Sequence, residues 1–317
     1  MTKSILKNFI KRTLFKNQIF MIDKTSTVQD AIKNNVNAGN TIFIGGFGHL
    51  IPFYLSHELI RQKIVDLTIC RSGADILFDQ LIASEIVKKV IFGYVGNPTV
   101  GLSHTFSRAY KKKSIEIEEW TNQSIIMRLH AARMGVSFIP SKILQIGDKP
   151  SNIAYLKQIT CPYTGHKFSA IPALKPDIAI LHAQCADKYG NIQMWGIDGD
   201  TIEGALASDK IIVSVEKIIS NSKIKESPEK TVIPSHRVSN IIELPWGAYP
   251  SYVSGYYSRD DDHYIEYDIT SRDEDKISSY LKNWVHDARN IQEYKKLIGN
   301  TKIKELQEGL CGVKNGD

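Results

Sequence analysis

Apolar runs alternate with helical patterns along the first hundred residues of the chain. Residues 41–44, 67–70 and 87–95 are predominantly apolar and end at glycine or polar residues, as strands buried on both faces of a sheet do. Residues 49–61 and 79–83, which lie between these runs, have the spacing of helices. Strands that alternate with helices are usually joined as parallel βαβ units, so this region predicts an open, parallel sheet.

The alternation continues after a less regular middle segment. Residues 115–120 predict a strand, and Thr121 begins a helical pattern that Gly135 ends. Residues 142–174 contain several prolines and glycines, and we interpret them as loops or short strands near the entrance to a site. Further strands are expected at 177–182, 191–195, 210–215 and 238–244, and helices at 200–207, 220–227 and 272–307. We therefore predict one α/β domain over residues 21–317, with an open, mostly parallel sheet, helices on both faces and a helical C-terminal end.

A glycine-rich turn, Gly-Gly-Phe-Gly at 45–48, follows the first predicted strand. Ligands of open α/β sheets bind at the carboxyl ends of the strands, and glycines expose backbone N–H groups there. The turn lacks both the GxGxxG pattern of dinucleotide sites and the Gly-Lys-Ser/Thr of phosphate-binding loops. A tight turn without a ligand is the alternative that this motif alone leaves open. In a parallel sheet, the turns expected at 71–73 and 93–97 would lie beside it on the same edge.

The composition indicates a globular protein. The chain has 317 residues, of which 42% are hydrophobic and 23% are charged. No apolar run approaches the roughly 18 residues that span a bilayer, so we expect no membrane association. The four cysteines form no CxxC pair, which favours reduced thiols in the cytoplasm over a disulfide framework or a zinc site. The aspartates at 260–262 lack the spacing of a calcium loop, and we expect no metal.

The net charge of +6 is unevenly distributed along the chain. Residues 1–20 contain five basic side chains and no acidic one, which leaves about +1 on the remainder. A body this close to neutral has no basic field for nucleic acid. We interpret residues 1–20 as a basic N-terminal extension that is either disordered or upstream of a native start at Met21; a targeting peptide is the alternative.

Three glutamates near strand ends could act as nucleophiles or bases, namely Glu203, Glu216 and Glu243. We favour roles in helix caps or salt bridges for all three. The GxSxG motif of α/β-hydrolases is absent. We interpret the histidines at 104, 130, 166, 182 and 236 as isolated packed or surface residues, because none has a known spacing from a cysteine or serine nucleophile.

Several short motifs, taken in order, resemble one family. They include Phe-Ile-Gly-Gly-Phe-Gly at 43–48, Gly-Tyr-Val-Gly-Asn at 93–97 and His-Ala-Ala-Arg-Met-Gly-Val at 130–136. Downstream, Val-Glu-Lys-Ile-Ile-Ser at 215–220 and Gly-Ala-Tyr-Pro-Ser at 247–251 continue the series. Together they resemble the α subunit of family I coenzyme A transferases, and in particular glutaconate CoA-transferase and its relatives, which include ring-cleaving CoA hydrolases.

The resemblance implies a partner β subunit of similar open α/β fold. The nucleophile of the family is a glutamate on that β subunit, so no catalytic side chain is expected in this chain. Coenzyme A then takes part as a substrate that moves between an acyl-CoA and a carboxylic acid, and no cofactor is implied. Matched by position, two turns would lie against the acyl oxyanion and the acyl or CoA group: Gly45, Gly46, Phe47, Gly48, Val95, Gly96 and Asn97.

Two departures from the family pattern leave the acyl substrate open. The segment between the glycine turn and Pro52 is one residue shorter than usual, and Tyr249 stands where relatives often have histidine. The alternatives are a CoA thioester hydrolase or ring-opening enzyme on the same scaffold, and a non-catalytic subunit that binds CoA or its partner. A sugar-phosphate isomerase is less favoured, because no Ser/Thr-rich phosphate turn follows the predicted strands.

Overall fold

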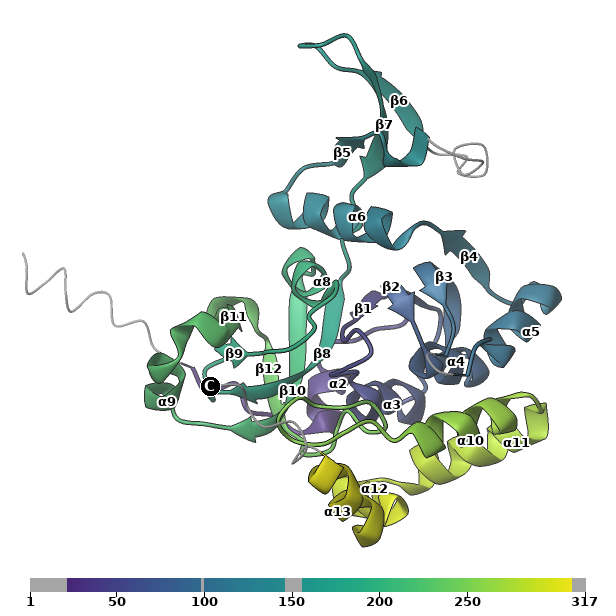
Figure 1. Ribbon diagram of the computed structural model, residues 1–317, viewed down its shortest axis with the longest axis vertical. Helices are drawn as coiled ribbons and strands as arrows, with labels where there is room; N and C mark the ends of the chain where they lie inside the picture. The colour runs from purple at the N-terminus through teal and green to yellow at the C-terminus, as the bar shows by residue number, and fades with distance from the viewer. Residues whose placement is uncertain (1–21, 98–99, 146–155, 310–317) are drawn as a thin grey trace, which may run out of the picture.

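A nine-stranded sheet is the centre of the computed structural model, which describes residues 22–97, 100–145 and 156–309 (Figure 1). Its parallel neighbours, in order, are β12 (Asn240–Glu243), β10 (Lys210–Ile218), β8 (Ile178–Ala186), β1 (Thr41–Ile44), β2 (Leu67–Ala74), β3 (Val87–Val95) and β4 (Glu116–Glu119). The short strands β9 (Ile192–Gln193) and β11 (Thr231–Ile233) extend β8 in the antiparallel sense. The predicted open, mostly parallel sheet is confirmed. The extension predicted at 1–20 lies outside the described residues.

The order of the strands reverses next to β1. From β1 the chain adds β2, β3 and β4 on one side, whereas β8, β10 and β12 are added on the other. Every residue of β8 is buried, as are the last three residues of β1, which explains why both segments are continuously apolar in the sequence. The boundary between β1 and β8 is the topological switch point, which is where open α/β sheets bind ligands.

Helices cover both faces of the sheet, as predicted. One face carries α2 (Val28–Lys33), α3 (Phe53–Arg61), α4 (Ile76–Ala83) and α5 (His104–Lys112), and the other carries α6 (Asn122–Met134) and α8 (Thr201–Ala207) (Figure 1). The limits predicted for α6 are confirmed. The Thr121 side chain accepts a hydrogen bond from the backbone N–H of Ser124, and Gly135 ends the helix with φ of 72°. The short helix α9 (Asn221–Glu226) follows β10.

The C-terminal end is helical, as expected, but it begins earlier than predicted. It consists of α10 (Asp261–Ser271), α11 (Glu274–Leu281), the π-helical turn η4 (Lys282–Asp287), α12 (Ile291–Ile298) and α13 (Asn300–Glu308). Asp260 caps α10 by accepting a hydrogen bond from the backbone N–H of His263, so the run of aspartates at 260–262 begins a helix. In the described parts of the chain, no helix is both long and apolar enough to cross a membrane.

Two other predicted boundaries are wrong because distant residues decide them. The strand β2 continues to Ala74, where a turn was predicted at 71–73, because these residues pair with β3. The helix α3 begins at Phe53 and not at residue 49, since Leu50 has a left-handed φ of 55°. The backbone N–H of Leu50 instead donates to the carbonyl of Tyr252 at 3.1 Å.

The irregular middle segment forms a separate arm. The strands β5 (Phe138–Ser141), β7 (Lys167–Pro172) and β6 (Lys157–Thr160) make a three-stranded antiparallel sheet that projects beyond α6 (Figure 1). A 3-10 turn, η1 (Ile143–Gln145), follows β5. The prediction of short strands within 142–174 is thus confirmed for β6 and β7.

Asp79 connects the C-terminal helices to the α/β body. This buried carboxylate accepts hydrogen bonds from the backbone N–H of Phe106 at 2.8 Å, from the Tyr267 hydroxyl at 3.0 Å and from the Ser103 hydroxyl. Its bonds therefore join α4, the start of α5 and α10.

We predict that Asp79→Ala lowers the free energy of unfolding by about 3 kcal/mol, because several buried donors lose their acceptor together. Tyr267→Phe, which removes one of these donors and keeps the ring, should cost only about 1 kcal/mol. Urea unfolding of both variants checks this. Equal losses for the two would contradict a shared role of the carboxylate.

Candidate functional site

The glycine turn at 45–48 lies at the carboxyl end of β1, beside the switch point. Its first three N–H groups are used within the protein. The N–H of Gly45 donates to the carbonyl of Ile180 at 2.9 Å, that of Gly46 to the Thr201 hydroxyl at 2.9 Å, and that of Phe47 to the carbonyl of His49 at 3.1 Å.

The next two N–H groups, those of Gly48 and His49, have no hydrogen-bond acceptor among the described residues. Gly48 has a φ of 70°, and a Cβ placed there would meet no atom within 4 Å, so the backbone at this position faces open space. Gly46 differs, because a Cβ there would lie 2.7 Å from the carbonyl oxygen of Leu50. The unused donors of the turn are therefore those of Gly48, which is one of the predicted residues, and of His49, which directly follows the predicted turn.

A buried ionic group lies beneath the turn. Arg71 in β2 is fully buried, and its guanidinium donates to the carbonyl of Gly46 and contacts the Asp75 carboxylate at 3.1 Å. Asp200, which precedes α8, accepts a hydrogen bond from the backbone N–H of Ser72 at 2.6 Å. Burial raises the pKa of Asp200, and the nearby charge of Arg71 opposes that shift.

The predicted residues at the end of β3 lie next to the same edge. The backbone N–H of Gly96 donates to the carbonyl of Ala74, the last residue of β2, at 3.1 Å. Asn97 is buried, and neither its side-chain oxygen nor its side-chain nitrogen has a hydrogen-bond partner among the described residues. The parallel order of β1, β2 and β3 thus brings the two predicted turns to one edge. An unpartnered buried amide at this edge is a group that a bound ligand can satisfy.

Phe47 and His49 give the turn its apolar and polar surroundings. The Phe47 ring lies over Gly73 and Gly199 and remains 37% exposed. The His49 side chain is buried and borders a small pocket of about 70 Å³, where its Nδ1 lies 3.1 Å from the carbonyl of Ile197. Burial lowers the pKa of His49 from 6.5 to about 4, so the imidazole is neutral at pH 7.

A sequence profile of the coenzyme A transferase family matches residues 25–244, which is more than half of the chain. The chain belongs to the coenzyme A transferase family. The α subunit of 3-oxoadipate CoA-transferase from Pseudomonas knackmussii is 33% identical over 279 residues, covering 87% of this chain and 98% of that subunit. The α subunit of glutaconate CoA-transferase from Acidaminococcus fermentans is 31% identical over 305 residues, covering 90% and 95%.

Solved structures agree with this assignment. The crystal structure of the Acidaminococcus fermentans glutaconate CoA-transferase matches 90% of this chain and 95% of its own with a TM-score of 0.86 at 30% identity. A more distant relative, the IpdA subunit of the cholesterol ring-cleaving hydrolase of Mycobacterium tuberculosis, is 28% identical over 260 residues, covering 78% and 88%. The fold and the family expected from the motifs are therefore confirmed.

The three candidate glutamates of this coenzyme A transferase chain are all engaged by other groups. Glu203 contacts Arg133 at 2.8 Å and His130 at 3.1 Å. Glu243 accepts a hydrogen bond from the backbone N–H of Ile218 at 3.0 Å. Glu203 thus has the salt-bridge role that we favoured, whereas Glu243 has a hydrogen bond in place of the predicted cap or salt bridge, and neither is a free nucleophile.

Glu216 belongs to a buried network whose residue types match a nucleophilic triad. His182 lies 2.8 Å from the Ser214 hydroxyl through Nδ1 and 2.9 Å from Glu216 through Nε2. Glu216 also accepts from the Tyr257 hydroxyl at 2.8 Å and from the backbone N–H of Trp246. The interpretation of His182 as isolated is therefore wrong, as it is for His130 and for His104, whose Nε2 lies 3.0 Å from the Asp268 carboxylate. Serine, histidine and glutamate are all buried, and none borders the pocket beside His49, so no substrate reaches them there.

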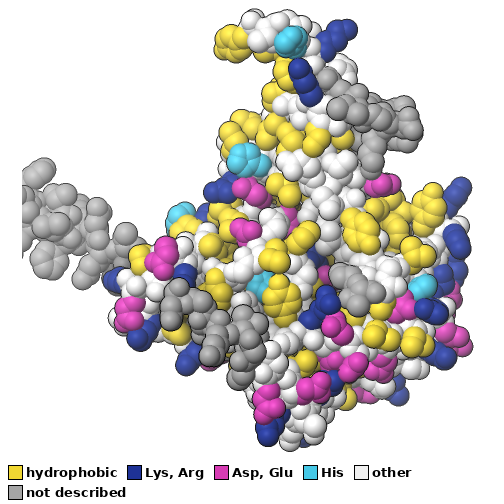
Figure 2. Space-filling model, in the orientation of Figure 1, with side chains coloured by type: hydrophobic (Ala, Val, Ile, Leu, Met, Phe, Trp, Pro, Cys, Tyr) yellow, Lys and Arg dark blue, Asp and Glu magenta, His cyan; other side chains and the backbone are white. Residues whose placement is uncertain are grey.

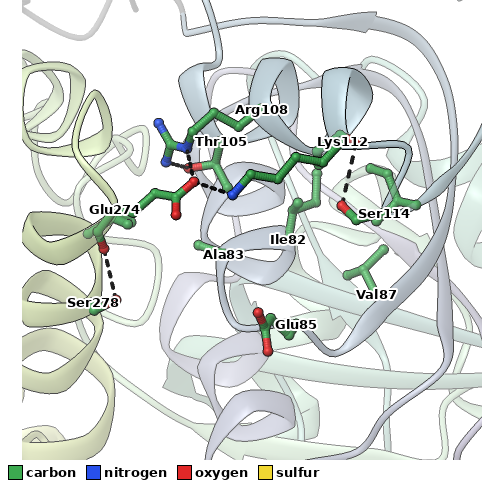
Figure 3. A pocket seen from close by; sticks show the side chains of 13 residues that line it. Ile82, Ala83, Glu85, Val87, Thr105, Arg108, Lys112, Ser114, Glu274 and Ser278 are labelled. Carbon is green, nitrogen blue, oxygen red and sulfur yellow. Dashed lines mark hydrogen bonds and ion pairs between the residues drawn. The ribbon is translucent and has the colours of Figure 1, made fainter.

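Figure 3 shows a larger pocket, of about 370 Å³, whose lining includes no residue of the glycine turn. It is formed near Val87, at the amino end of β3, together with α5 and α11. Arg108 and Lys112 point toward Glu274 in this pocket, with nitrogen–oxygen distances of 3.5 and 2.5 Å. Because Glu274 pairs with both cations and the pocket is at the opposite edge of the sheet from the glycine turn, we do not place the acyl site there.

Hydrophobic side chains are exposed around the site and the arm. On the face shown in Figure 2 they gather over α6, the base of the arm and the centre of the sheet. Exposed apolar residues of these elements are Phe47, Met134, Phe138 and Ile197, which are between 37% and 60% exposed. A surface of this kind next to a ligand site is typical of a protein interface.

Sequence reasoning did not single out His49, Arg71 or Thr201 as site residues. His49 follows the last glycine of the turn. Arg71 directly follows an apolar run that predicts a buried strand, and a charged residue at that place is a signal, because arginine is seldom fully buried. Thr201 carried no signal, since only the fold brings it to Gly46.

We predict that the His49 imidazole stays neutral between pH 8 and 5. The pKa of His49 in the folded chain, about 4, is below the ordinary value of 6.5. As the pH falls, the unfolded chain therefore binds a proton at His49 before the folded chain does. The stability that the neutral imidazole contributes is lost as the pH falls from about 6.5 toward 4. Histidine NMR spectra, assigned by comparison with His49→Gln, measure this. A midpoint near the ordinary value would contradict the burial of this side chain.

Proposed function

We propose that the chain is the α subunit of a heteromeric acyl-CoA:carboxylate CoA-transferase, and that its glycine turn binds the acyl oxyanion while a β subunit supplies the nucleophilic glutamate. The enzyme would require no cofactor or metal, with coenzyme A as a substrate. We place it in the cytoplasm, where the described cysteines, which are unpaired, would stay reduced.

One observation carries the proposal: the edge at the switch point has free backbone donors, whereas the candidate glutamates of the described chain are not free. The N–H groups of Gly48 and His49 lack acceptors, and Glu203, Glu216 and Glu243 are all engaged elsewhere. A site of this kind can stabilise negative charge on an oxygen but cannot begin covalent transfer by itself. The two relatives above are each one subunit of a CoA-transferase, and the exposed apolar side chains around the turn likewise favour completion by a second subunit.

The chemistry divides one transfer into two exchanges. A carboxylate oxygen of the β-subunit glutamate attacks the thioester carbon, the C–S bond breaks, and CoA leaves as a thiolate with an acyl anhydride remaining. The thiolate then attacks the glutamyl carbonyl of the anhydride, which releases the first carboxylic acid and forms a glutamyl-CoA thioester. The acceptor carboxylate repeats these steps in reverse and regenerates the glutamate. Each addition places a negative charge on the carbonyl oxygen, which the donors of Gly48 and His49 would hold.

The acid substrates are proposed to be short dicarboxylic acids. Two of the relatives described above are named for 3-oxoadipate and glutaconate, both of which are dicarboxylic acids. In this chain the neutral His49 and the unpartnered amide of Asn97 are polar groups without excess charge at the same edge. They would orient a polar acyl group by hydrogen bonds.

We expect the purified chain alone to transfer no CoA, and the complex with its β subunit to do so when acyl-CoA and an acceptor acid are both present. Product acyl-CoA is measured by chromatography. Transfer by the single chain would overturn the assignment of the nucleophile to the partner. Release of free CoA without an acceptor acid would favour the hydrolase alternative, which the ring-cleaving relative suggests.

We predict that Gly48→Ala lowers turnover of the complex at least about tenfold, because a methyl group would enter the open space beside the two donors. The matched control is Gly165→Ala, in the arm. Gly165 also has a φ of 70° and open space around it, so the backbone strain is the same. Equal activity of the two variants would remove Gly48 from the site.

A further inference from the structure

We infer that Arg71 is a positioning residue, which fixes the peptide group between Gly46 and Phe47 and so decides which atoms of the turn face the acyl oxygen. The inference rests on the proposed function. It assigns a role in turnover to a side chain that lies behind the turn and does not itself reach the open space at Gly48.

The burial of Arg71 is the first step of the argument. A fully buried guanidinium is costly unless its charge is paired; the two terminal nitrogens of Arg71 have partners, whereas its Nε–H has none among the described residues. Asp75 pairs the charge at 3.1 Å and at the same time caps α4, where it accepts a hydrogen bond from the backbone N–H of Leu77 at 3.0 Å. The second arm of the guanidinium is directed to the carbonyl of Gly46. The two terminal nitrogens of the planar guanidinium serve these two partners in a fixed geometry, whereas an ammonium group would have to reach both from a single nitrogen.

The opposite side of Gly46 is also held by a side chain. Its N–H donates to the hydroxyl of Thr201, the first residue of α8, at 2.9 Å. Both polar groups of Gly46 are thus fixed, the carbonyl from β2 and the N–H from α8. This is needed because Gly46 has a φ of 90° and follows another glycine, so that the local chain restricts these peptide groups very little.

The direction of the Gly46 carbonyl has a consequence for the reaction. The carbonyl points inward to Arg71, and the N–H of the same peptide group closes the turn on the carbonyl of His49 at 3.1 Å. If this peptide group rotated, the closing bond would be lost and a carbonyl oxygen would turn toward the place where the oxyanion forms. Its partial negative charge would then oppose the charge that Gly48 and His49 are proposed to stabilise.

This effect belongs to the transition state, because the substrate carbonyl has little negative charge before attack. Loss of Arg71 should therefore lower kcat and leave KM almost unchanged. If Arg71 had only a structural role, its loss would lower the amount or the stability of the active complex without lowering kcat selectively relative to KM. The two kinetic constants, measured per assembled complex, distinguish the roles.

The test is Arg71→Lys in the complex with the β subunit. We expect kcat to fall about 100-fold and KM for acyl-CoA to change less than about threefold. The matched control is Arg61→Lys. Arg61 is a nearly buried arginine in α3 that contacts Glu58 at 2.6 Å and donates to the carbonyls of Tyr54 and Val285, both at 3.1 Å, so it loses comparable bonds away from the turn. Its complex should retain the wild-type kcat.

A second pair of variants keeps the inference testable if Arg71→Lys does not fold. Thr201→Val removes the acceptor of the Gly46 N–H and keeps a β-branched side chain, whereas Thr201→Ser keeps the acceptor. We expect the valine variant to lose kcat about 100-fold and the serine variant to restore it. Wild-type kcat in Thr201→Val, or in a folded Arg71→Lys, would overturn the positioning role and leave the proposed function intact. A wild-type complex that transfers no CoA would overturn both.

Discussion

The position of β1 between two parallel neighbours decides where every other part of the site lies. Its residues pair with β2 on one side, as in Ile42 with Ile69, and with β8 on the other, as in Ile42 with Ile178. Because all three strands run in one direction, their carboxyl ends lie at a common edge. Arg71 from β2 and Thr201, which follows β8 and β9, therefore reach the same glycine from opposite sides. The sheet and α8 together hold the backbone of the turn.

Under the proposed function, the described chain accounts for one half of a catalytic site. It provides backbone donors at Gly48 and His49 and a neutral imidazole held by burial. Its own glutamates near the strand ends serve the structure, with Glu216 sealed among His182, Tyr257 and Trp246. Such a division suits covalent transfer, since the groups that hold the oxyanion and the carboxylate that attacks are placed on separate, rigid scaffolds.

The sequence predicted the elements that depend on local pattern. Apolar runs located β1 and β3, and Thr121 and Gly135 located both ends of α6, because these signals lie within the element itself. It failed where distant residues decide. Pairing with β3 extends β2 through the predicted turn, and the contact of Leu50 with Tyr252 delays α3. For the same reason the sequence located the glycine turn but not which N–H groups remain free, since Thr201 is 155 residues from Gly46.

The most direct test of the account is the intact mass of both subunits after the complex is incubated with acyl-CoA in the absence of an acceptor acid. The account predicts that the β subunit gains the mass of a CoA thioester on one glutamate, while this chain keeps its unmodified mass. A CoA adduct on this chain, at Glu203, Glu216 or Glu243, would contradict the central claim that it supplies backbone donors and not the nucleophile.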